Sequence, residues 1–356
     1  MKNLAILFGG RAAEYPISLI SASNIIKECR SLEDYQIFRI GINKQGEFYE
    51  YLGPDDLIAQ DKWQNDPKNI CEISFQPGLV KGYLRHTRDT AEIQEVDVFF
   101  PVLHGLDGEG GPLQGFLDIL GVDYVGCRQL AAACMMDKIV ANILFDAAKL
   151  EQAVWCYFDT RIDDLDAEYV DQLIRDHRMH YPVFIKPANT GSSVGISRVN
   201  NYQALAQALE LAAKYDHRIL IEEAVFGREL EVAVLSTKAD HITVSLPGEI
   251  IPGNEFYDYE DKYAEDSKSQ LKIPANLPEE EILILQDLAA QAFIAGTCEG
   301  LARVDFFRRE SDGAFLINEI NTMPGFTAIS MYPKLMEEIG LGGRELILKL
   351  IESASQ

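Results

Sequence analysis

The chain has 356 residues, 47% of them hydrophobic, which is long enough for two or three folded domains and argues against disorder. Acidic residues outnumber basic ones by 56 to 32, so the formal charge is −24. Because a surface of that sign repels nucleic acid and anionic membranes, we exclude both as partners, and a site for an anionic nucleotide must gather lysines locally.

A cytoplasmic location is expected. The six cysteines are scattered without a C-x-x-C pair, which is typical of free thiols in a reducing compartment. The apolar run at residues 4–8 is too short for a signal peptide, and no stretch approaches the roughly 20 apolar residues of a membrane span.

Short apolar runs alternate with helical patterns in the first third of the chain. The pattern predicts strands at 4–8, 37–42 and 96–103, and helices at 17–30 and 112–120. This βαβ rhythm predicts a doubly wound open sheet in a fold of the α/β (α+β) class. The loops at Gly9-Gly10 and His104-Gly105 both follow strands, so we expect both at the carboxyl edge, where such sheets bind ligands.

The pattern changes near residue 130. A helix is predicted at 130–150, followed by strands at 183–187, 219–223, 231–235, 301–307 and 315–320, with helices at 279–296 and after Pro333. Residues 253–272 are polar, rich in tyrosine and weakly periodic. They predict a long loop, and long loops in compact domains often act as lids.

The last two predicted strands carry opposed carboxylates. A hairpin centred on Asp312 pairs Asp305 with Glu319, and Arg303 with Asn321, all on one face. A cation between the carboxylates would offset their repulsion, and oxygen ligands without His or Cys select Mg²⁺ or Mn²⁺. Arg303 adds a fixed charge for a developing oxyanion. The alternative is a solvated strand face with incidental charges, because a bulge would break this register.

Lys186 ends a predicted strand, and residues 187–195 form a glycine- and serine-rich loop after it. Glycines let backbone N–H groups approach phosphate oxygens, and the lysine supplies countercharge. The loop is not a Walker A motif, because no Gly-Lys-Ser/Thr precedes a helix. An ordinary hairpin turn is the alternative, and Lys138 is a candidate second lysine.

Glu222 and Glu223 end another strand, and Glu229 follows six residues later. Such an edge can accept a hydrogen bond from an adenine amino group, and Glu229 can accept one from a ribose hydroxyl. Taken alone, these glutamates are more typical of surface acids.

In their order and spacing, the motifs resemble those of D-alanine–D-alanine ligases, a family of the ATP-grasp superfamily. The matching segments cover nearly the whole chain and are residues 8–10, Glu14, 18–19, 101–105, 136–138, 186–195, 256–263, 318–327 and 330–333.

The resemblance implies an N-terminal Rossmann-like domain at 1–129, a central ATP-grasp subdomain at 130–224, and a C-terminal ATP-grasp subdomain at 225–356 with the lid loop 253–272. It implies that ATP drives the joining of two D-alanines through a D-alanyl phosphate, for peptidoglycan synthesis. It also implies a homodimer.

The resemblance assigns the site residues to groups. Two Mg²⁺ or Mn²⁺ ions would be held by Asp305, Glu319 and Asn321. ATP would be contacted by Lys138, Lys186, Ser193, Glu222, Glu223, Val225, Glu229 and, from the lid, Lys262. The two D-alanines would be bound by Glu14, His104, Arg303, Ser330 and Met331.

The implied catalytic set overlaps these groups and comprises Glu14, Ser192, Tyr263, Arg303, Gly325 and Ser330. Arg303 and the Gly325 backbone would form the oxyanion site. Tyr263, from the lid, would be linked to Glu14 and Ser192 by hydrogen bonds.

Two positions depart from the family pattern. Pro16 stands where a polar or acidic residue is more usual, which leaves Glu14 in place but affects the local turn. Gly110 stands where an acid is expected, so a supporting contact to His104 is left open.

The acceptor remains a choice among D-alanine, D-serine and D-lactate. Residues 253–272 contain Tyr263 and no histidine, whereas lactate-type relatives differ there. Met331 follows Ser330, whereas serine-type relatives tend to carry an arginine. These residues favour D-alanine at both positions, with D-serine second.

Two other classes compete with the ligase. Gly9-Gly10 after a first strand is compatible with a dinucleotide-binding oxidoreductase, but no full G-x-G-x-x-G follows. A non-catalytic nucleotide-binding protein is the third interpretation, and the intact Lys186 and Arg303 argue against it.

Overall fold

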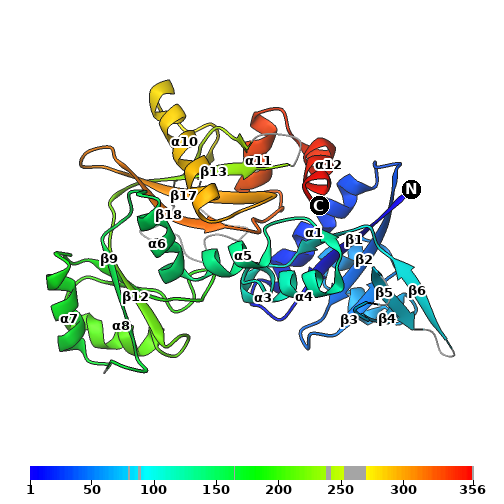
Figure 1. Cartoon of the computed structure of the whole chain (residues 1–356), viewed down its shortest axis with the longest axis horizontal. Helices are drawn as coiled ribbons and strands as arrows, with labels where there is room; N and C mark the ends of the chain where they lie inside the picture. Colours follow the sequence, from blue (N-terminus) through cyan, green and yellow to red (C-terminus); the bar gives the residue numbers. More distant parts are fainter. Residues whose placement is uncertain (79–80, 87–89, 164, 238–241, 252–269, 355–356) are drawn as a thin grey trace.

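The computed structural model describes residues 1–78, 81–86, 90–163, 165–237, 242–251 and 270–354. The chain forms three sheets with helices around them (Figure 1). The first sheet lies at one end of the molecule, the second at the other, and the third lies above the space between them in that view.

The first sheet has the strand order β6-β5-β4-β3-β2-β1-β7-β8. Its parallel half contains β1 (Lys2–Gly9), β2 (Tyr35–Ile42), β7 (Val98–Val102) and β8 (Asp123–Tyr124). Its antiparallel half contains β3 (Phe48–Tyr51), β4 (Ile70–Ser74), β5 (Gly82–His86) and β6 (Ala91–Glu95). The predicted open sheet is confirmed in the parallel half, while the antiparallel extension was not predicted.

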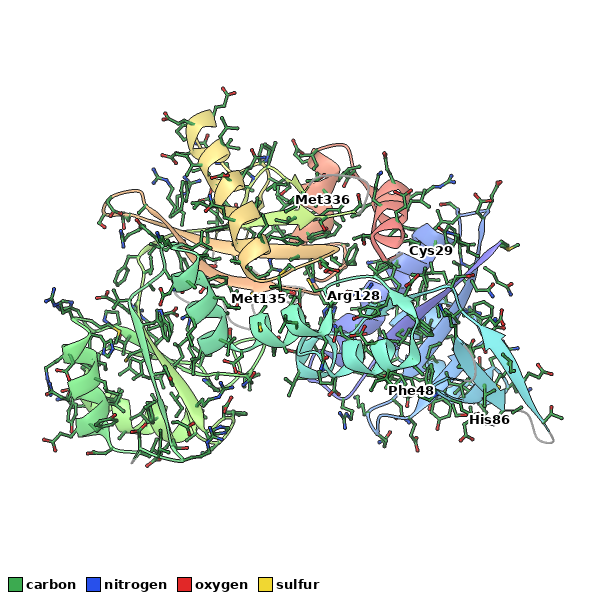
Figure 2. All side chains as sticks on the ribbon, viewed as in Figure 1. Cys29, Phe48, His86, Arg128, Met135 and Met336 are labelled. Atoms are coloured by element: carbon green, nitrogen blue, oxygen red, sulfur yellow. The ribbon has the colours of Figure 1, made fainter. Side chains whose placement is uncertain are left out.

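Helices cover both faces of this sheet, which explains why β1 is apolar along its length. Alternate residues of β1, such as Ile6 and Leu7, enter two different cores. The first core includes α1 (Tyr15–Cys29) and α12 (Gly343–Ala354), and the second includes α4 (Pro112–Leu120). Cys29 and Met336, labelled in Figure 2, belong to the first core.

Strand β1 lies between β2 and β7, so the loops that follow β1 and β7 are neighbours at the carboxyl edge. Gly9 is required there because its φ is 95° and a Cβ atom would lie 2.1 Å from the Ile42 carbonyl oxygen. The expected position of both loops is confirmed. Short elements complete this region: α2 (Asp56–Ala59), η1 (Trp63–Asn65) and α3 (Gly105–Glu109).

The helix predicted at 130–150 is in fact two helices, α5 (Gln129–Met136) and α6 (Lys138–Ala147). Asp137 separates them with a ψ of 104°, and its carboxylate accepts hydrogen bonds from the backbone N–H groups of Ile139 and Val140. This side-chain cap starts a new helix, so Lys138 stands at a helix N-terminus and not in a helix interior.

The second sheet is antiparallel, with the order β11-β10-β12-β9. It contains β9 (Trp155–Asp159), β10 (Val183–Pro187), β11 (Ser197–Val199) and β12 (Arg218–Glu223). One buried cluster joins it to α7 (Ala167–Asp176) and α8 (Leu205–Ala212), with η2 (Tyr202–Ala204) ahead of α8. Strands β10 and β12 were predicted; β9, β11, α7 and α8 were not.

The third sheet follows the order β16-β15-β13-β17-β18, with β14 paired to β13. It contains β13 (Gly227–Leu235), β14 (Thr243–Val244), β15 (Gly248–Ile251), β16 (Gln270–Lys272), β17 (Leu301–Arg309) and β18 (Phe315–Asn321). Helices α10 (Glu279–Ala295) and α11 (Met331–Glu338) pack on it. The last three residues of the predicted lid loop are therefore a strand, and residues 252–269 lie outside the described part.

The division of the chain after residues 129 and 224 stays a prediction. The C-terminal helix α12 returns to the first sheet, where it shares a buried core with α1 and β7. In the described part of the chain, no helix is long and apolar enough to cross a membrane.

Candidate active site

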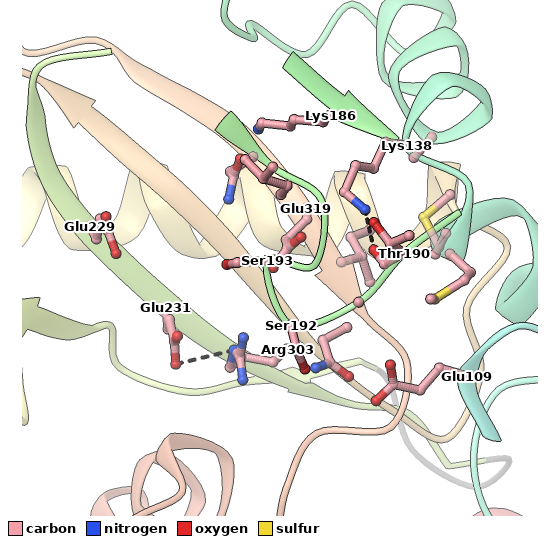
Figure 3. A pocket seen from close by; sticks show the side chains of 18 of the residues that line it. Glu109, Lys138, Lys186, Thr190, Ser192, Ser193, Glu229, Glu231, Arg303 and Glu319 are labelled. Carbon is pink, nitrogen blue, oxygen red and sulfur yellow. Dashed lines mark hydrogen bonds and ion pairs between the residues drawn. The ribbon is translucent and has the colours of Figure 1, made fainter. Parts of the chain in front are cut away.

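One cavity lies between the second and third sheets and reaches the carboxyl edge of the first (Figure 3). Nearly all of the predicted site residues that the structure describes line it: Glu14, His104, Lys138, Lys186, Ser192, Ser193, Glu222, Glu223, Val225, Glu229, Arg303, Glu319, Asn321, Gly325, Ser330 and Met331. Asp305 lines a smaller adjoining cavity, together with Glu319. Lys262 and Tyr263 lie outside the described residues.

The predicted pairing of the metal hairpin is observed, although the hairpin is not centred as expected. Asp305 is opposite Glu319, and Arg303 is opposite Asn321. Nearer the turn the register shifts, because Phe306 pairs with Ile317 and Asn318 is an extra residue on β18. The bulge lies between the carboxylate pair and the turn. It shifts the register of the residues nearer the turn and leaves Asp305 opposite Glu319.

Arg303 lies between two buried acids. Its Nε and Nη2 donate to Asp305 at 2.7 and 2.6 Å, and its Nε forms an ion pair with Glu231 at 3.1 Å. Burial alone would lower the pKa of Arg303, but Asp305 and Glu231 outweigh it and hold the pKa well above the ordinary value. Arg303 is therefore a permanent cation. The sequence did not identify Glu231 as a site residue. The predicted strand 231–235 began at this position, so the alternation of residues before it gave no indication of the face on which Glu231 lies.

The hairpin offers a donor set that fits a hard divalent cation. Two carboxylates, of Asp305 and Glu319, stand on directly opposed positions, and the amide of Asn321 follows on the same face. Among the described residues, no three His, Cys, Asp or Glu side chains converge closely enough to form a metal cluster on their own. An ion held here would therefore take further oxygen ligands from a substrate or from water, as Mg²⁺ usually does.

Two lysines gather at the opposite wall of the cavity. Lys138 donates from Nζ to the carbonyl oxygen of Thr190, and Lys186 forms an ion pair with Glu222. Burial lowers the pKa of Lys138, and Lys186 lowers it further against the opposing effect of Glu319. Together with the N-terminus of α6, these lysines make a local positive wall in an acidic protein.

The glycine- and serine-rich loop leaves the ordinary regions of backbone conformation. Ser192 and Ser193 have φ values of 51° and 60°, which are uncommon for residues other than glycine, asparagine or aspartate. Backbone strain of this kind persists where the surroundings enforce it, and it collects at functional sites.

A half-buried network of hydrogen bonds and ion pairs enforces the position of this loop. Asn189 donates from Nδ2 to Asp137 at 3.0 Å and to Asp216 at 3.1 Å, and Arg218 also pairs with Asp137. Since Asp137 is the cap that precedes Lys138, one set of contacts fixes both the loop and the lysine.

The acids predicted for the nucleotide occupy two strands that face the cavity. Glu222 and Glu223 end β12, and Glu223 accepts from the backbone N–H of His180 at 3.1 Å. Glu229 lies within β13, because that strand begins at Gly227, four residues earlier than predicted.

The deep end of the cavity is built around Glu14. Its carboxylate accepts a hydrogen bond of 2.5 Å from Ser192 Oγ, a direct contact that was not predicted. The predicted links of both residues to Tyr263 fall outside the described residues. Pro16 lies in the first turn of α1, where its missing N–H is not needed, and Glu14 remains in place at the helix N-terminus. Gly105 approaches so closely that a Cβ atom would lie 2.7 Å from Glu14 Oε2.

His104 has an acidic neighbour after all. Its Nδ1 lies 3.0 Å from the carbonyl oxygen of Met323 and 3.4 Å from Glu109 Oε1. The acidic contact to His104 that Gly110 cannot make is thus made by Glu109, one position earlier. Burial raises the pKa of Glu109, partly offset by His104 and reinforced by Glu14 and Glu319. Among the described residues, His104 Nε2 is buried without a hydrogen-bond partner.

Ser330, Met331 and Gly325 form the remaining end of the cavity. Ser330 stands before the first turn of α11, and its Oγ accepts from the backbone N–H of Thr327 at 3.0 Å. The first backbone N–H groups of α11 have no side-chain cap from Ser330, and such groups bind carboxylates well. Gly325 approaches Ser330 so closely that a Cβ atom would lie 2.7 Å from its Oγ.

Two family models match the chain. Residues 3–127 match the model described as D-ala D-ala ligase N-terminus, and residues 144–352 match D-ala D-ala ligase C-terminus. A D-alanine–D-alanine ligase of Acetivibrio thermocellus is 44% identical and is matched over 100% of this chain and 96% of its own length. A second, of Caldicellulosiruptor bescii, is also 44% identical, over 99% of this chain and 94% of its own length.

Solved structures give the same grouping. The VanG D-Ala:D-Ser ligase from Enterococcus faecalis is 37% identical, with a TM-score of 0.88 over 99% of each chain. The D-alanine–D-alanine ligase from Coxiella burnetii is 32% identical, with a TM-score of 0.85 over 99% of this chain and 93% of that one.

Proposed function

The chain belongs to the D-alanine–D-alanine ligase family, and from this premise we propose how its cavity joins two D-alanines at the expense of ATP. The family activity yields D-alanyl-D-alanine, ADP and phosphate, and the dipeptide is used in cell-wall synthesis. The observation that carries the proposal is that a lysine wall, Glu319 and the Glu14 end all open into one cavity, while Asp305, opposite Glu319, lines the smaller cavity that adjoins it.

The nucleotide is proposed to lie between the second and third sheets. Glu222, Glu223 and the Val225 backbone would bind adenine, and Glu229 would bind the ribose. Lys138, Lys186 and Ser193, with Lys262 of the lid, would hold the phosphates, since two cationic side chains and a strained loop face the same space. Lys186 would then exchange its ion pair with Glu222 for a phosphate oxygen.

Asp305, Glu319 and Asn321 are proposed to hold two Mg²⁺ or Mn²⁺ ions against those phosphates. Such ions supply charge neutralisation to the transferring phosphoryl group. The chain contributes the ligand geometry through the Asp305–Glu319 pairing, and the charge of Glu319 also acts on Lys138.

The first D-alanine is proposed to bind with its ammonium group at Glu14. This carboxylate is buried, held by Ser192 and close to Gly105, so it can bind a cation in a defined place. The substrate carboxylate would then take the γ-phosphoryl group, giving D-alanyl phosphate and ADP.

The second D-alanine is proposed to bind its carboxylate at Ser330 and at the N-terminus of α11, where Met331 begins the helix. Its amine attacks the acyl phosphate, Arg303 and the Gly325 backbone stabilise the oxyanion, and phosphate leaves. His104 borders the same space. Tyr263 and the rest of the lid would exclude water, because acyl phosphates hydrolyse readily.

D-serine is the second candidate for the acceptor, because a D-Ala:D-Ser ligase is among the similar structures. The sequence Ser330-Met331 still favours D-alanine, since Met331 is apolar and buried and offers no partner for an acceptor hydroxyl.

The test is product identification with ATP, Mg²⁺ and a panel of D-amino and D-hydroxy acids. We expect ADP release that requires both Mg²⁺ and D-alanine, and D-alanyl-D-alanine as the main product. A larger yield of D-alanyl-D-serine at equal acceptor concentrations would make D-serine the acceptor. ADP release independent of Mg²⁺ would contradict the metal site.

A homodimer, on the basis of the family resemblance alone, and a cytoplasmic location, on the basis of the scattered cysteines, complete the proposal. Light scattering of the purified protein and fractionation of the source cells test these two points separately.

A further inference from the structure

Three acids form a row across the third sheet. Glu231 on β13 is opposite Asp305 on β17, and Asp305 is opposite Glu319 on β18. Directly opposed residues lie on the same face of a sheet, so all three carboxylates project from the face that carries the site. Glu231 lines both the main cavity and the smaller one beside it. The reaction described above gives roles to Asp305 and Glu319 but none to Glu231.

Glu231 is buried and forms an ion pair with Arg303, as Figure 3 shows. A buried carboxylate is costly unless it is paired, so this contact needs an explanation. The pairing is diagonal, because Arg303 is opposite Ala233 and reaches back by two positions to Glu231. A long side chain spans that distance, and the guanidinium thereby stays on the cavity side of the sheet.

Arg303 has two acceptors for one hydrogen. Its Nε donates to Asp305 Oδ1 at 2.7 Å, and Glu231 Oε2 lies 3.1 Å from the same nitrogen. A small rotation of the guanidinium therefore transfers this hydrogen bond from Asp305 to Glu231.

Asp305 meets two competing demands. Both of its oxygens accept from Arg303 in this structure, and both are also oxygens that a divalent cation needs. A guanidinium and a divalent cation on one carboxylate repel each other, so Arg303 must loosen its hold on Asp305 when a cation binds. Arg303 must nevertheless stay near the reacting carbonyl group if it is to stabilise an oxyanion.

We propose that Glu231 is a positioning residue that takes over Arg303 from Asp305, so that Asp305 can bind the divalent cation while Arg303 stays at the oxyanion site. This inference rests on the proposed roles of Arg303 and Asp305. Without Glu231, Arg303 would keep its hydrogen bonds to Asp305, and cation binding would have to displace the guanidinium from that carboxylate without the acceptor that now lies 3.1 Å from its Nε.

The experiment compares four variants with the wild type: Glu231→Gln, Arg303→Lys, the double variant, and Glu249→Gln. The last is a matched control, because Glu249 lies in the same sheet and pairs with Arg228 at 2.6 Å, away from the cavity. Each protein is checked by thermal unfolding, and kcat and the KM values for ATP and D-alanine are measured. Separately, calorimetry measures ADP binding as Mn²⁺ is titrated, a readout that does not depend on turnover.

For Glu231→Gln we expect kcat to fall by about tenfold, somewhat less than for complete loss of an oxyanion donor, with KM for ATP nearly unchanged. The Mn²⁺ concentration for half-maximal ADP binding should rise about fivefold or more, the size of a typical coupling between sites. Glu249→Gln should change neither quantity. In the Arg303→Lys background, Glu231→Gln should have a much smaller effect, because the guanidinium that it positions is gone.

Equal kcat and equal Mn²⁺ dependence in wild type and Glu231→Gln would overturn the inference, as would an undiminished effect in the Arg303→Lys background. If Arg303→Lys alone keeps full turnover, the proposed oxyanion role is wrong, and the Mn²⁺ titration still decides whether Glu231 frees Asp305. Should Glu231→Gln fail to fold, Glu231→Asp keeps the charge on a shorter side chain, and the same titration applies to it.

Discussion

Ser192 Oγ donates a hydrogen bond of 2.5 Å to the carboxylate of Glu14, and this contact joins the loop after β10 to the residue that precedes α1. The two residues are 178 positions apart in the chain. The contact connects the proposed ammonium site to the proposed phosphate loop, so the two substrates are expected to influence each other's binding.

Replacing Ser192 by alanine should therefore weaken the binding of both substrates. We expect KM for the first D-alanine to rise by about three- to tenfold, since a hydrogen bond to a charged group contributes roughly 1.5–3 kcal/mol at most and water replaces part of it. The coupling itself is measured as the change in Kd for D-alanine with and without a bound ATP analogue. Ser353→Ala, on the distant α12, is the control. A Kd ratio in Ser192→Ala equal to that of wild type would contradict the coupling.

Gly105→Ala should damage the same end of the cavity for a steric reason. Gly105 has a φ of 71°, and a Cβ atom there would lie 2.7 Å from Glu14 Oε2 and 2.8 Å from the Ala12 Cβ. We expect KM for the first D-alanine to rise at least tenfold, as Glu14 is pushed from its place.

A matched control separates this clash from backbone strain. Gly121 has a φ of 66°, and a Cβ atom added there would meet no other atom within 4 Å, so Gly121→Ala carries the strain alone. Both variants should lose about 1 kcal/mol of stability from the left-handed backbone. Equal KM values in the two variants would refute the steric explanation.

The half-buried Glu109 should make the stability of the protein depend on pH. Burial raises its pKa above the ordinary value of 4.5, so the native state binds more protons than the unfolded state between the two pKa values. Stability contributed by this group is thus present at low pH and is lost as pH rises through the native pKa. Glu109→Gln does not titrate, so it should be more stable than wild type at neutral pH, with the advantage shrinking as the pH falls toward 4.5.

Thermal unfolding of both proteins from pH 4 to 8, which brackets the ordinary range of a carboxyl group, measures this difference. Glu72→Gln, on an exposed strand position, is the control and should show no such trend. An advantage of Glu109→Gln that is constant across the range would mean that the carboxyl group is not the cause.

Local patterns were enough to predict the parts of the site that lie on one or two neighbouring elements. The alternation of residues 301–307 and 315–320, with a turn between them, placed Asp305 opposite Glu319. The prediction succeeded although Asn318 bulges out, because the bulge offsets the error in the centre of the turn. The positions of the loops at Gly9-Gly10 and His104-Gly105 were likewise predictable, because each loop follows a predicted strand.

Contacts between distant segments could not be predicted in this way. The close approach of Gly105 to Glu14, and the anchoring of Asn189 by Asp216, depend on how whole elements pack. The break at Asp137 was missed because hydrophobic periodicity continues through it, while a single side-chain cap decides where the new helix begins. Strands β5 and β6 were not predicted, because their polar and apolar residues alternate too weakly to indicate a strand.

Glu319 should be indispensable for turnover and dispensable for folding. It is opposite Asp305 on the neighbouring strand, and its charge opposes the lowering of the Lys138 pKa by burial, so it connects the proposed cation site to the phosphate-binding lysines. Glu319→Gln keeps the shape but removes the charge. Because bound metal is worth several kcal/mol of transition-state stabilisation, ADP release should fall on the order of a hundredfold or more. Glu310→Gln, exposed at the turn of the same hairpin, serves as the control and should keep full activity. Circular dichroism spectra should be unchanged in both variants. ADP release by Glu319→Gln at the wild-type rate would mean that Glu319 is not part of the cation site.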